Sequence, residues 1–285
     1  MPRRLHNESY EERVRNFDWD SLTLANAYVF AQVMKNKVIC KGVLERLLGH
    51  AIANINYLEV EKAMDQGPLS KSVRLDVYIE SDEDVAFDVE MQAQDTRELP
   101  KRARYHQSMM DMESLEKGAT YRTLRTSYVI FLCLEDVFKR GQYRYSFQNT
   151  CAEVANLNLD DDTFIIFFNT KGPEGEISTE LKALFDYIEG KPSDDPFVRL
   201  IDEEVQRVKN NIRWRRQYML QRDYKVDYIE QGIEQGIERG IERGIERGAR
   251  EKAIEIARNL LKKEMPIEDI AEVLQLSIEE LNFLY

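Results

Sequence analysis

Two short segments of alternating apolar residues, joined by an acidic turn, constrain the fold of this chain most strongly. They lie in RLDVYIESDEDVAFDVEMQ, residues 74–92. The alternating apolar positions are Val73, Leu75, Val77 and Ile79, followed by Val85, Phe87, Val89 and Met91. A period of two predicts strands with one buried face, and the turn between them predicts an antiparallel hairpin. The opposite face then collects acidic side chains: Asp76, Glu80, Asp88 and Glu90.

This acidic face has two interpretations, a solvated outer surface or a metal site. If Val77 and Val89 share one side, Asp76 and Glu90 share the other, directly opposite or one pair diagonal. Such side chains lie about 5 Å or about 7–8 Å apart. Two carboxylates that close repel unless a cation lies between them, and Mg²⁺ prefers oxygen ligands. A metal there could generate hydroxide and stabilise charge on a phosphate. The spacing leaves both interpretations open, and Asp88 and Glu80 remain alternative ligands.

The remaining pattern predicts an α/β or α+β core with helices against a mixed sheet. Helices are expected over 21–49, with a break near Asn36, a cap at Ser21 or Thr23 and an end at Gly49, and over 98–117, 178–190 and 197–229. Strands are expected at 55–62, 127–134 and 163–169, with a more exposed one at 143–149. The runs at 127–134 and 163–169 are continuously apolar, which suits strands buried on both faces.

Composition limits the partners that the chain can bind. Its net charge of −12 disfavours nucleic acid unless local basic patches or a metal contribute. Residues 97–125 and 199–216 carry more Lys and Arg than Asp and Glu, and so provide such patches. The three cysteines show no metal-ligand spacing, and the three histidines, His6, His50 and His106, are scattered, so a structural role is expected for each histidine. The sequence has no apolar stretch long enough to span a bilayer, so we expect a soluble, cytoplasmic protein with no membrane partner.

The hairpin residues and several later motifs resemble a known family. VRLDVYI followed by FDVEMQ resembles motifs II and III of the PD-(D/E)XK nuclease superfamily. LPKRARYHQSMMDMESLEKGATYRTLRTSYVIFLC, IIFFNTKGPEGEISTELKALFDYI and the glutamate/glycine repeat further on resemble the Rpn family of recombination-promoting nucleases and transposases. The resemblance runs from about residue 20 to beyond residue 220.

The resemblance implies an α/β fold, with a restriction-endonuclease-like core of mixed central sheet and flanking helices plus a C-terminal helical extension. It implies a Mg²⁺-dependent DNA endonuclease, with Mn²⁺ as a possible substitute, linked to recombination or to defence against foreign DNA. Asp76 and Glu90 would be the metal ligands, and Gln92, where many superfamily members have lysine, would position the attacking water. Glu45 matches a helical acidic position loosely. The alternative is a DNA-binding or interaction protein that keeps the fold without efficient cleavage.

Two further residues are candidates for phosphate contact. Arg102 and Tyr105 lie one turn apart on the predicted helix that follows Gln92, so they share a side of it. An arginine can bind phosphate with two parallel hydrogen bonds. The sequence favours this role and a simple surface charge beside a partly buried tyrosine equally.

The C-terminal third contains an internal repeat, IEQGIEQGIERGIERGIERG, at residues 229–248. Glycine recurs every four residues beside isoleucine, which predicts a helical spacer with weak self-association, and hence a homo-oligomer. The expected domains are a PD-(D/E)XK nuclease-like domain at 1–192, a charged helical region at 193–228, the repeat helix at 229–250 and a small helical module at 251–285. That last module has two short helices around Leu276–Ser277, and its acidic character favours packing or dimerisation over reading DNA.

Overall fold

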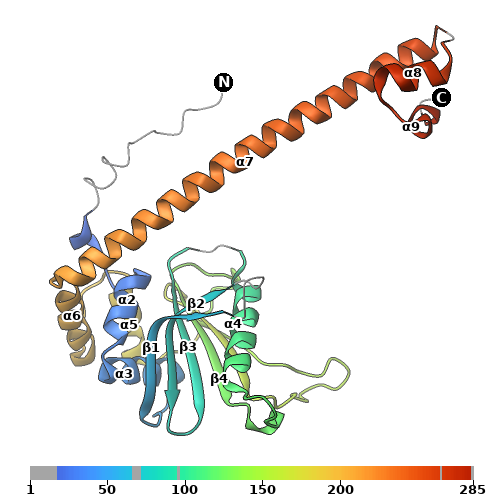
Figure 1. Cartoon of the computed structure of the whole chain (residues 1–285). Helices are drawn as coiled ribbons and strands as arrows, with labels where there is room; N and C mark the ends of the chain where they lie inside the picture. The colour runs from blue at the N-terminus through green and yellow to red at the C-terminus, as the bar shows by residue number, and fades with distance from the viewer. Residues whose placement is uncertain (1–17, 66–71, 95–96, 264, 284–285) are drawn as a thin grey trace. The chain divides into compact units, whose positions relative to one another are not determined.

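A six-stranded mixed sheet forms the centre of the protein (Figure 1). The computed structural model describes residues 18–65, 72–94, 97–263 and 265–283. The strands are β1 (Ile55–Met64), β2 (Val73–Ser81), β3 (Val85–Gln92), β4 (Thr126–Cys133), β5 (Arg144–Phe147) and β6 (Thr163–Asn169), in the spatial order β1-β2-β3-β4-β6-β5. β1, β2 and β3 pair antiparallel, β3-β4 and β4-β6 pair parallel, and β5 pairs antiparallel with β6. The predicted α/β fold with a mixed sheet is confirmed.

Helices cover both faces of this sheet. One face packs with α2 (Ala27–Met34), α3 (Lys37–Leu48), α5 (Thr179–Ile188) and α6 (Pro196–Lys209) in the larger apolar cluster. The other face packs with α4 (Leu99–Ser114) in a second cluster. β4 contributes Ile130 and Leu132 to the first cluster and Val129 and Phe131 to the second. Its continuous apolar run is therefore explained by burial on both faces, as predicted.

Local capping residues explain most of the helix boundaries. The predicted break near Asn36 is confirmed, because its side chain accepts hydrogen bonds from Val38 N and Ile39 N and so begins α3. Gly49 ends α3 at φ 80°, a left-handed conformation that glycine adopts without strain. The predicted start was wrong: Asn26 caps α2 through Tyr28 N and Val29 N, whereas Ser21 lies in the short turn η1 (Trp19–Ser21).

The hairpin alternation also departs from the prediction at one residue. Val77 and Ile79 pack in the larger cluster, but Val73 and Leu75 pack in the cluster beneath α4. The apolar side of β2 therefore changes at Asp76, where the β2–β3 ladder has already ended at the pair Val77↔Val89. β2 stays paired with β1 as far as Met64↔Val73, but no pair forms opposite Asp76, where Glu61 of β1 has φ 53°. The period of two is therefore interrupted at this position, as at a strand irregularity.

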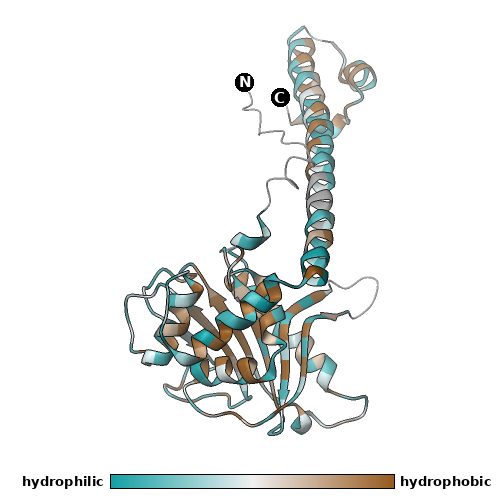
Figure 2. Ribbon diagram, turned by 90° about the vertical axis from the view of Figure 1, so that its left-hand side faces the viewer, coloured by the Kyte–Doolittle hydropathy of each residue, from teal (hydrophilic) through white to brown (hydrophobic). Residues whose placement is uncertain are grey.

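The C-terminal part is helical and includes α7 (Ile212–Leu261), α8 (Ile267–Leu274) and α9 (Ile278–Asn282). The expected helix over 197–229 is interrupted at Asn210–Asn211, since Asn211 caps α7 through Arg213 N and Trp214 N. The repeat is helical, and along it hydrophobic and hydrophilic residues alternate (Figure 2). Ala257, Ile270 and Leu281 form a small apolar cluster of their own. Within the described residues, no helix combines the length and apolar character needed to cross a membrane.

Contacts divide the chain into two compact units. The unit that contains the sheet extends to Arg216, and the second runs from Gln217 to Tyr285. α6 belongs to the first unit, because it packs against α2, α3 and α5. The four-part domain division expected from the sequence stays a prediction, although the packing of α6 already continues the folded core beyond residue 192.

The turn after β6 has no room for a side chain at Gly172. A Cβ there would lie 2.6 Å from Tyr143 N and 2.7 Å from Tyr143 Cα. The Tyr143 backbone cannot move aside easily, since its N–H donates to Glu174 O at 3.0 Å and its carbonyl accepts from Asn169 N at 2.9 Å. We expect Gly172→Ala to lower the free energy of unfolding by about 2–3 kcal/mol, measured by urea denaturation.

The neighbouring exposed residue provides the control. Lys171 makes a surface ion pair with Glu189 at 3.3 Å, so Lys171→Ala should change the free energy of unfolding by less than about 1 kcal/mol. Equal stability of Gly172→Ala and the parent protein would contradict the close approach described for Tyr143.

Candidate active site

Asp76 and Glu90 lie at the point where β2 and β3 separate. The last backbone pair between the strands is Val77↔Val89. One residue further, the two carboxylates accept the hydrogen bonds that backbone carbonyl groups would accept in a continued ladder. Asp76 N donates to Glu90 Oε1 at 2.8 Å, and Met91 N donates to Asp76 Oδ2 at 3.1 Å. The end of the ladder therefore fixes both side chains through backbone N–H groups of the opposite strand.

The acidic residues of β3 are buried rather than solvated. Asp88 is 0 % exposed and Glu90 is 1 % exposed, because α4 packs over this face of the sheet. A solvated outer face therefore does not explain these two carboxylates. Glu80 lies apart from them: it accepts from the Tyr78 hydroxyl at 2.9 Å and pairs with Arg125 at 2.7 Å.

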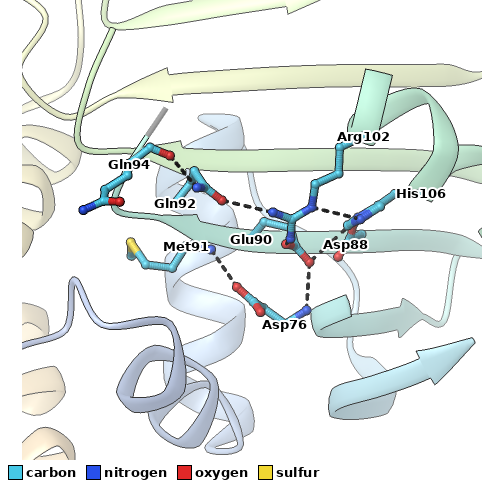
Figure 3. A network of polar contacts seen from close by, with 8 residues as sticks. All are labelled: Asp76, Asp88, Glu90, Met91, Gln92, Gln94, Arg102 and His106. Atoms are coloured by element: carbon cyan, nitrogen blue, oxygen red, sulfur yellow. Dashed lines mark hydrogen bonds and ion pairs between the residues drawn. The ribbon is translucent and has the colours of Figure 1, made fainter. Parts of the chain in front are cut away.

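Arg102 on α4 connects the residues of this site (Figure 3). Its Nη2 donates to Glu90 Oε2, its Nη1 to Gln92 Oε1 at 3.1 Å, and its Nε to His106 Nε2 at 3.2 Å. Gln92 in turn donates its amide N–H to the carbonyl of Gln94. Three of the residues singled out from the sequence, Glu90, Gln92 and Arg102, are thus in direct contact.

His106 belongs to the same network, although the sequence indicated only a structural role for it. Its Nδ1 lies 2.8 Å from Asp88 Oδ2 and 3.8 Å from Glu90 Oε1. Ligand atoms of Asp88, Glu90 and His106 all lie within 4.8 Å of one another. The sequence did contain one indication that His106 belongs to the site. It follows Arg102 by four residues, so a helix places both side chains on one side.

Burial changes the proton affinity of these groups. Burial, reinforced by the charge of Asp88, raises the pKa of Glu90 to about 8, and Arg102 opposes this shift. Burial also raises the pKa of Asp76 and of Asp88 well above the usual range, with further contributions from Glu90 and Asp76 respectively. Burial lowers the pKa of His106 to about 4, so its ring is neutral at pH 7. Each carboxylate would hold its negative charge more readily beside a cation.

The oxygen atoms around Asp76 and Glu90 suit a divalent metal. Asp88 Oδ1 is buried without a hydrogen-bond partner, and Asp76 Oδ1 has none among the described residues. Oxygen-rich sites of this kind fit Mg²⁺ or Mn²⁺. Asp76 and Glu90 would hold the ion, which could activate a water and stabilise negative charge on a phosphate.

A basic cavity of about 550 Å³ opens beside the network. Its basic lining residues are Arg74, Arg97, Lys101, Arg102 and Arg104. The neutral ring of His106 and Tyr105, which is 37 % exposed, also line it. Glu98 is the acidic residue in this lining. The cavity concentrates positive charge on α4, in a chain whose net charge is −12, and so provides the local patch that an anionic ligand needs.

Glu45 makes its polar contacts elsewhere. Its carboxylate accepts from Ile52 N at 3.2 Å and lies 3.8 Å from Lys41 Nζ. These contacts hold the turn that follows α3 and give Glu45 a structural role; its supporting role at the site stays a prediction.

Comparison with known proteins yields one match. The family described as PD-(D/E)XK nuclease family transposase matches residues 25–231, which span the whole sheet and α2 to α6. A search of curated proteins and a search of solved structures each found no match.

A metal held by Glu90 should stabilise the folded protein. We expect Mn²⁺ at 100 times its dissociation constant to raise the free energy of unfolding by about 2.7 kcal/mol, because the unfolded chain lacks the assembled site. Thermal unfolding with and without Mn²⁺ measures this. Glu90→Gln should abolish the shift.

Glu80→Gln is the matched control for that measurement, since Glu80 belongs to the same hairpin but pairs with Arg125. It should retain the full Mn²⁺ shift. If Glu90→Gln keeps the shift or Glu80→Gln loses it, the metal does not bind at Glu90.

Proposed function

Since the chain belongs to the PD-(D/E)XK nuclease family transposases, we propose that it is a divalent-metal-dependent DNA endonuclease. It hydrolyses phosphodiester bonds with Mg²⁺, or with Mn²⁺ as a substitute, in DNA recombination or in defence against foreign DNA. The observation that carries this proposal is the contact between Asp76 and Glu90 at the end of the β2–β3 ladder, beside a basic cavity.

Asp76 and Glu90 are the proposed metal ligands. Their carboxylates are held by Met91 N and Asp76 N, so little side-chain freedom is lost when an ion binds. The bound metal would lower the pKa of a water and offset charge on the phosphate. Gln92 keeps one amide N–H beyond its contact with Gln94, and this N–H can orient the attacking water.

The proposed substrate is DNA, bound through its phosphates. The basic cavity supplies five Arg and Lys side chains, which offset the acidic total of the chain. Arg102 and Tyr105 both line it, which supports phosphate contact over the simple surface charge that the sequence left equally open. Cation contacts to phosphates release counterions and produce a strong dependence of affinity on salt.

We also propose that the repeat helix mediates weak self-association. Along α7, four isoleucines are 57–67 % exposed: Ile233, Ile237, Ile241 and Ile245. A regular apolar stripe beside glycines suits the close approach of a second helix. The oligomeric state of the full chain in solution, measured by light scattering, tests this.

Asp76→Ala should abolish Mg²⁺-dependent cleavage of plasmid DNA. It removes a proposed ligand, and without a held metal the activated water is lost. Nicking of supercoiled plasmid, followed on agarose gels with Mg²⁺ or EDTA, measures this. Glu80→Gln should cut at the parental rate, and equal cutting by Asp76→Ala would assign the activity to another site.

A catalytically weak DNA-binding protein is the alternative. The neutral amide of Gln92, where many superfamily members have lysine, favours it. A shift of DNA on a gel, with no cleavage in Mg²⁺ or Mn²⁺, would establish this alternative and overturn the nuclease proposal.

Gln92→Ala should lower the single-turnover cleavage rate roughly tenfold to hundredfold, as expected for one lost positioning hydrogen bond. Mn²⁺ affinity, measured by calorimetry, should be nearly unchanged, because a neutral amide is a weak ligand beside two carboxylates. Gln92→Lys should retain or raise the rate unless the new charge is repelled by Arg102, which contacts this side chain. A parental rate in Gln92→Ala would show that the water is held elsewhere.

A further inference from the structure

The guanidinium of Arg102 is held in a fixed orientation. Three of its N–H groups donate to Glu90, Gln92 and His106. Its Cζ also lies 5.5 Å from the centre of the Phe131 ring, within the range of a cation–π contact. A restrained arginine loses little side-chain entropy when it binds an anion.

This arrangement leaves part of the guanidinium free. Arginine carries five N–H groups, and the three contacts use one each on Nε, Nη1 and Nη2. The two remaining N–H groups have no partner among the described residues. The side chain is 35 % exposed and lines the basic cavity. The two free donors, one on Nη1 and one on Nη2, can therefore donate to the oxygens of a phosphate in the cavity.

The orientation of Arg102 depends on His106 and, through it, on Asp88. Because Arg102 Nε can only donate, His106 Nε2 must accept, which places the ring proton on Nδ1. Nδ1 then donates to Asp88 Oδ2 at 2.8 Å. Asp88 is 0 % exposed and His106, at the edge of the cavity, is 2 % exposed, so both offer a ligand almost no surface. Their contacts fix the tautomer that Arg102 requires.

We propose that Arg102 is the phosphate-binding cation of this site, and that Asp88 and His106 are its positioning residues. The proposal rests on the proposed nuclease function and extends it. Gln92 brings no charge to the site, whereas Arg102, in contact with it, brings a permanent one. As negative charge develops on the phosphate during attack, a preoriented guanidinium stabilises it without reorganisation.

The closeness of Asp88, Glu90 and His106 also suits a metal ion bound by all three. Both ring nitrogens of His106 are already engaged, with Arg102 and with Asp88, which favours the positioning role. The metal interpretation makes a separate prediction: loss of the imidazole would remove one bound metal per chain. The number of metal ions bound per chain in a variant without the imidazole therefore distinguishes the two interpretations.

Two substitutions at one position isolate the acceptor for Arg102. His106→Leu removes it, whereas His106→Gln keeps a carbonyl oxygen near the place of Nε2. We expect His106→Leu to lower the single-turnover cleavage rate about tenfold to hundredfold, the usual effect of losing such a support, and His106→Gln to recover most of the rate. The number of Mn²⁺ ions bound per chain, counted by electron paramagnetic resonance, should not change.

Gln107→Leu controls for loss of stability. Gln107 is a buried polar neighbour on α4, but it bonds to the Ser127 hydroxyl rather than to the site. It should keep the parental cleavage rate even if its melting temperature falls as far as that of His106→Leu. Equal rates in His106→Leu and Gln107→Leu, or loss of one Mn²⁺ in His106→Leu, would overturn the proposal.

DNA binding in EDTA separates this proposal from the nuclease function. If the parent protein cuts no DNA, the nuclease proposal fails, but Arg102 can still be tested as a phosphate ligand. Arg102→Gln should reduce the slope of log affinity against log salt by about 1, and His106→Leu should weaken binding in the same direction. Affinities equal to that of Gln107→Leu would overturn the role of Arg102 as well.

Discussion

The contact between Arg102 and Glu90 is the interaction on which the site depends. The hairpin and its neighbouring helix enclose Asp88 and Glu90, and ionised carboxylates lose much of their hydration when they are buried. A guanidinium against Glu90 recovers part of that energy, and the shared neighbours Gln92 and His106 keep it in place. The site is therefore one coupled group of charges, and a change in any member alters the proton affinity of the others.

The enclosure of these acids follows from the connection between β3 and β4. The two strands are parallel, so the chain must cross over the sheet between Gln92 and Thr126, and α4 is part of that crossover. α4 anchors itself through Leu99 and Ala103, both 0 % exposed. The same helix carries Arg102 and His106 to the acidic face. The crossover that the parallel strands require therefore places Arg102 and His106 beside Asp88 and Glu90.

Much of this architecture could be predicted from local patterns. Asn36 and Gly49 mark the boundaries of α3 in the sequence, and the unbroken apolar runs of β4 and β6 indicate burial on both faces. The alternation of acidic residues in β3 could not by itself predict whether this face of the sheet lies against solvent or against a helix. That depends on the parallel pairing of β3 with β4, which requires a crossover containing α4. His106 was missed for the same reason: its partner Asp88 lies 18 residues away in sequence and meets it only through that crossover. The change of side at Asp76 lies where the β2–β3 ladder ends and where Glu61 of β1 has φ 53°, and the residue pattern of β2 alone records neither.

The four-residue repeat of α7 has a consequence for the gene that encodes it. One repeat unit corresponds to twelve nucleotides, so gain or loss of a unit keeps the reading frame. Each added unit lengthens the helix by about 6 Å and rotates the residues that follow by about 40°. Apart from the nearby backbone of α7 itself, a Cβ at Gly232, Gly236, Gly240, Gly244 or Gly248 would meet no described atom within 4 Å, so no packing contact within this chain requires glycine at these positions. A change in the number of units therefore alters the length of α7 and the rotation of the residues after it, and leaves the residues of the sheet and its charged site as they are.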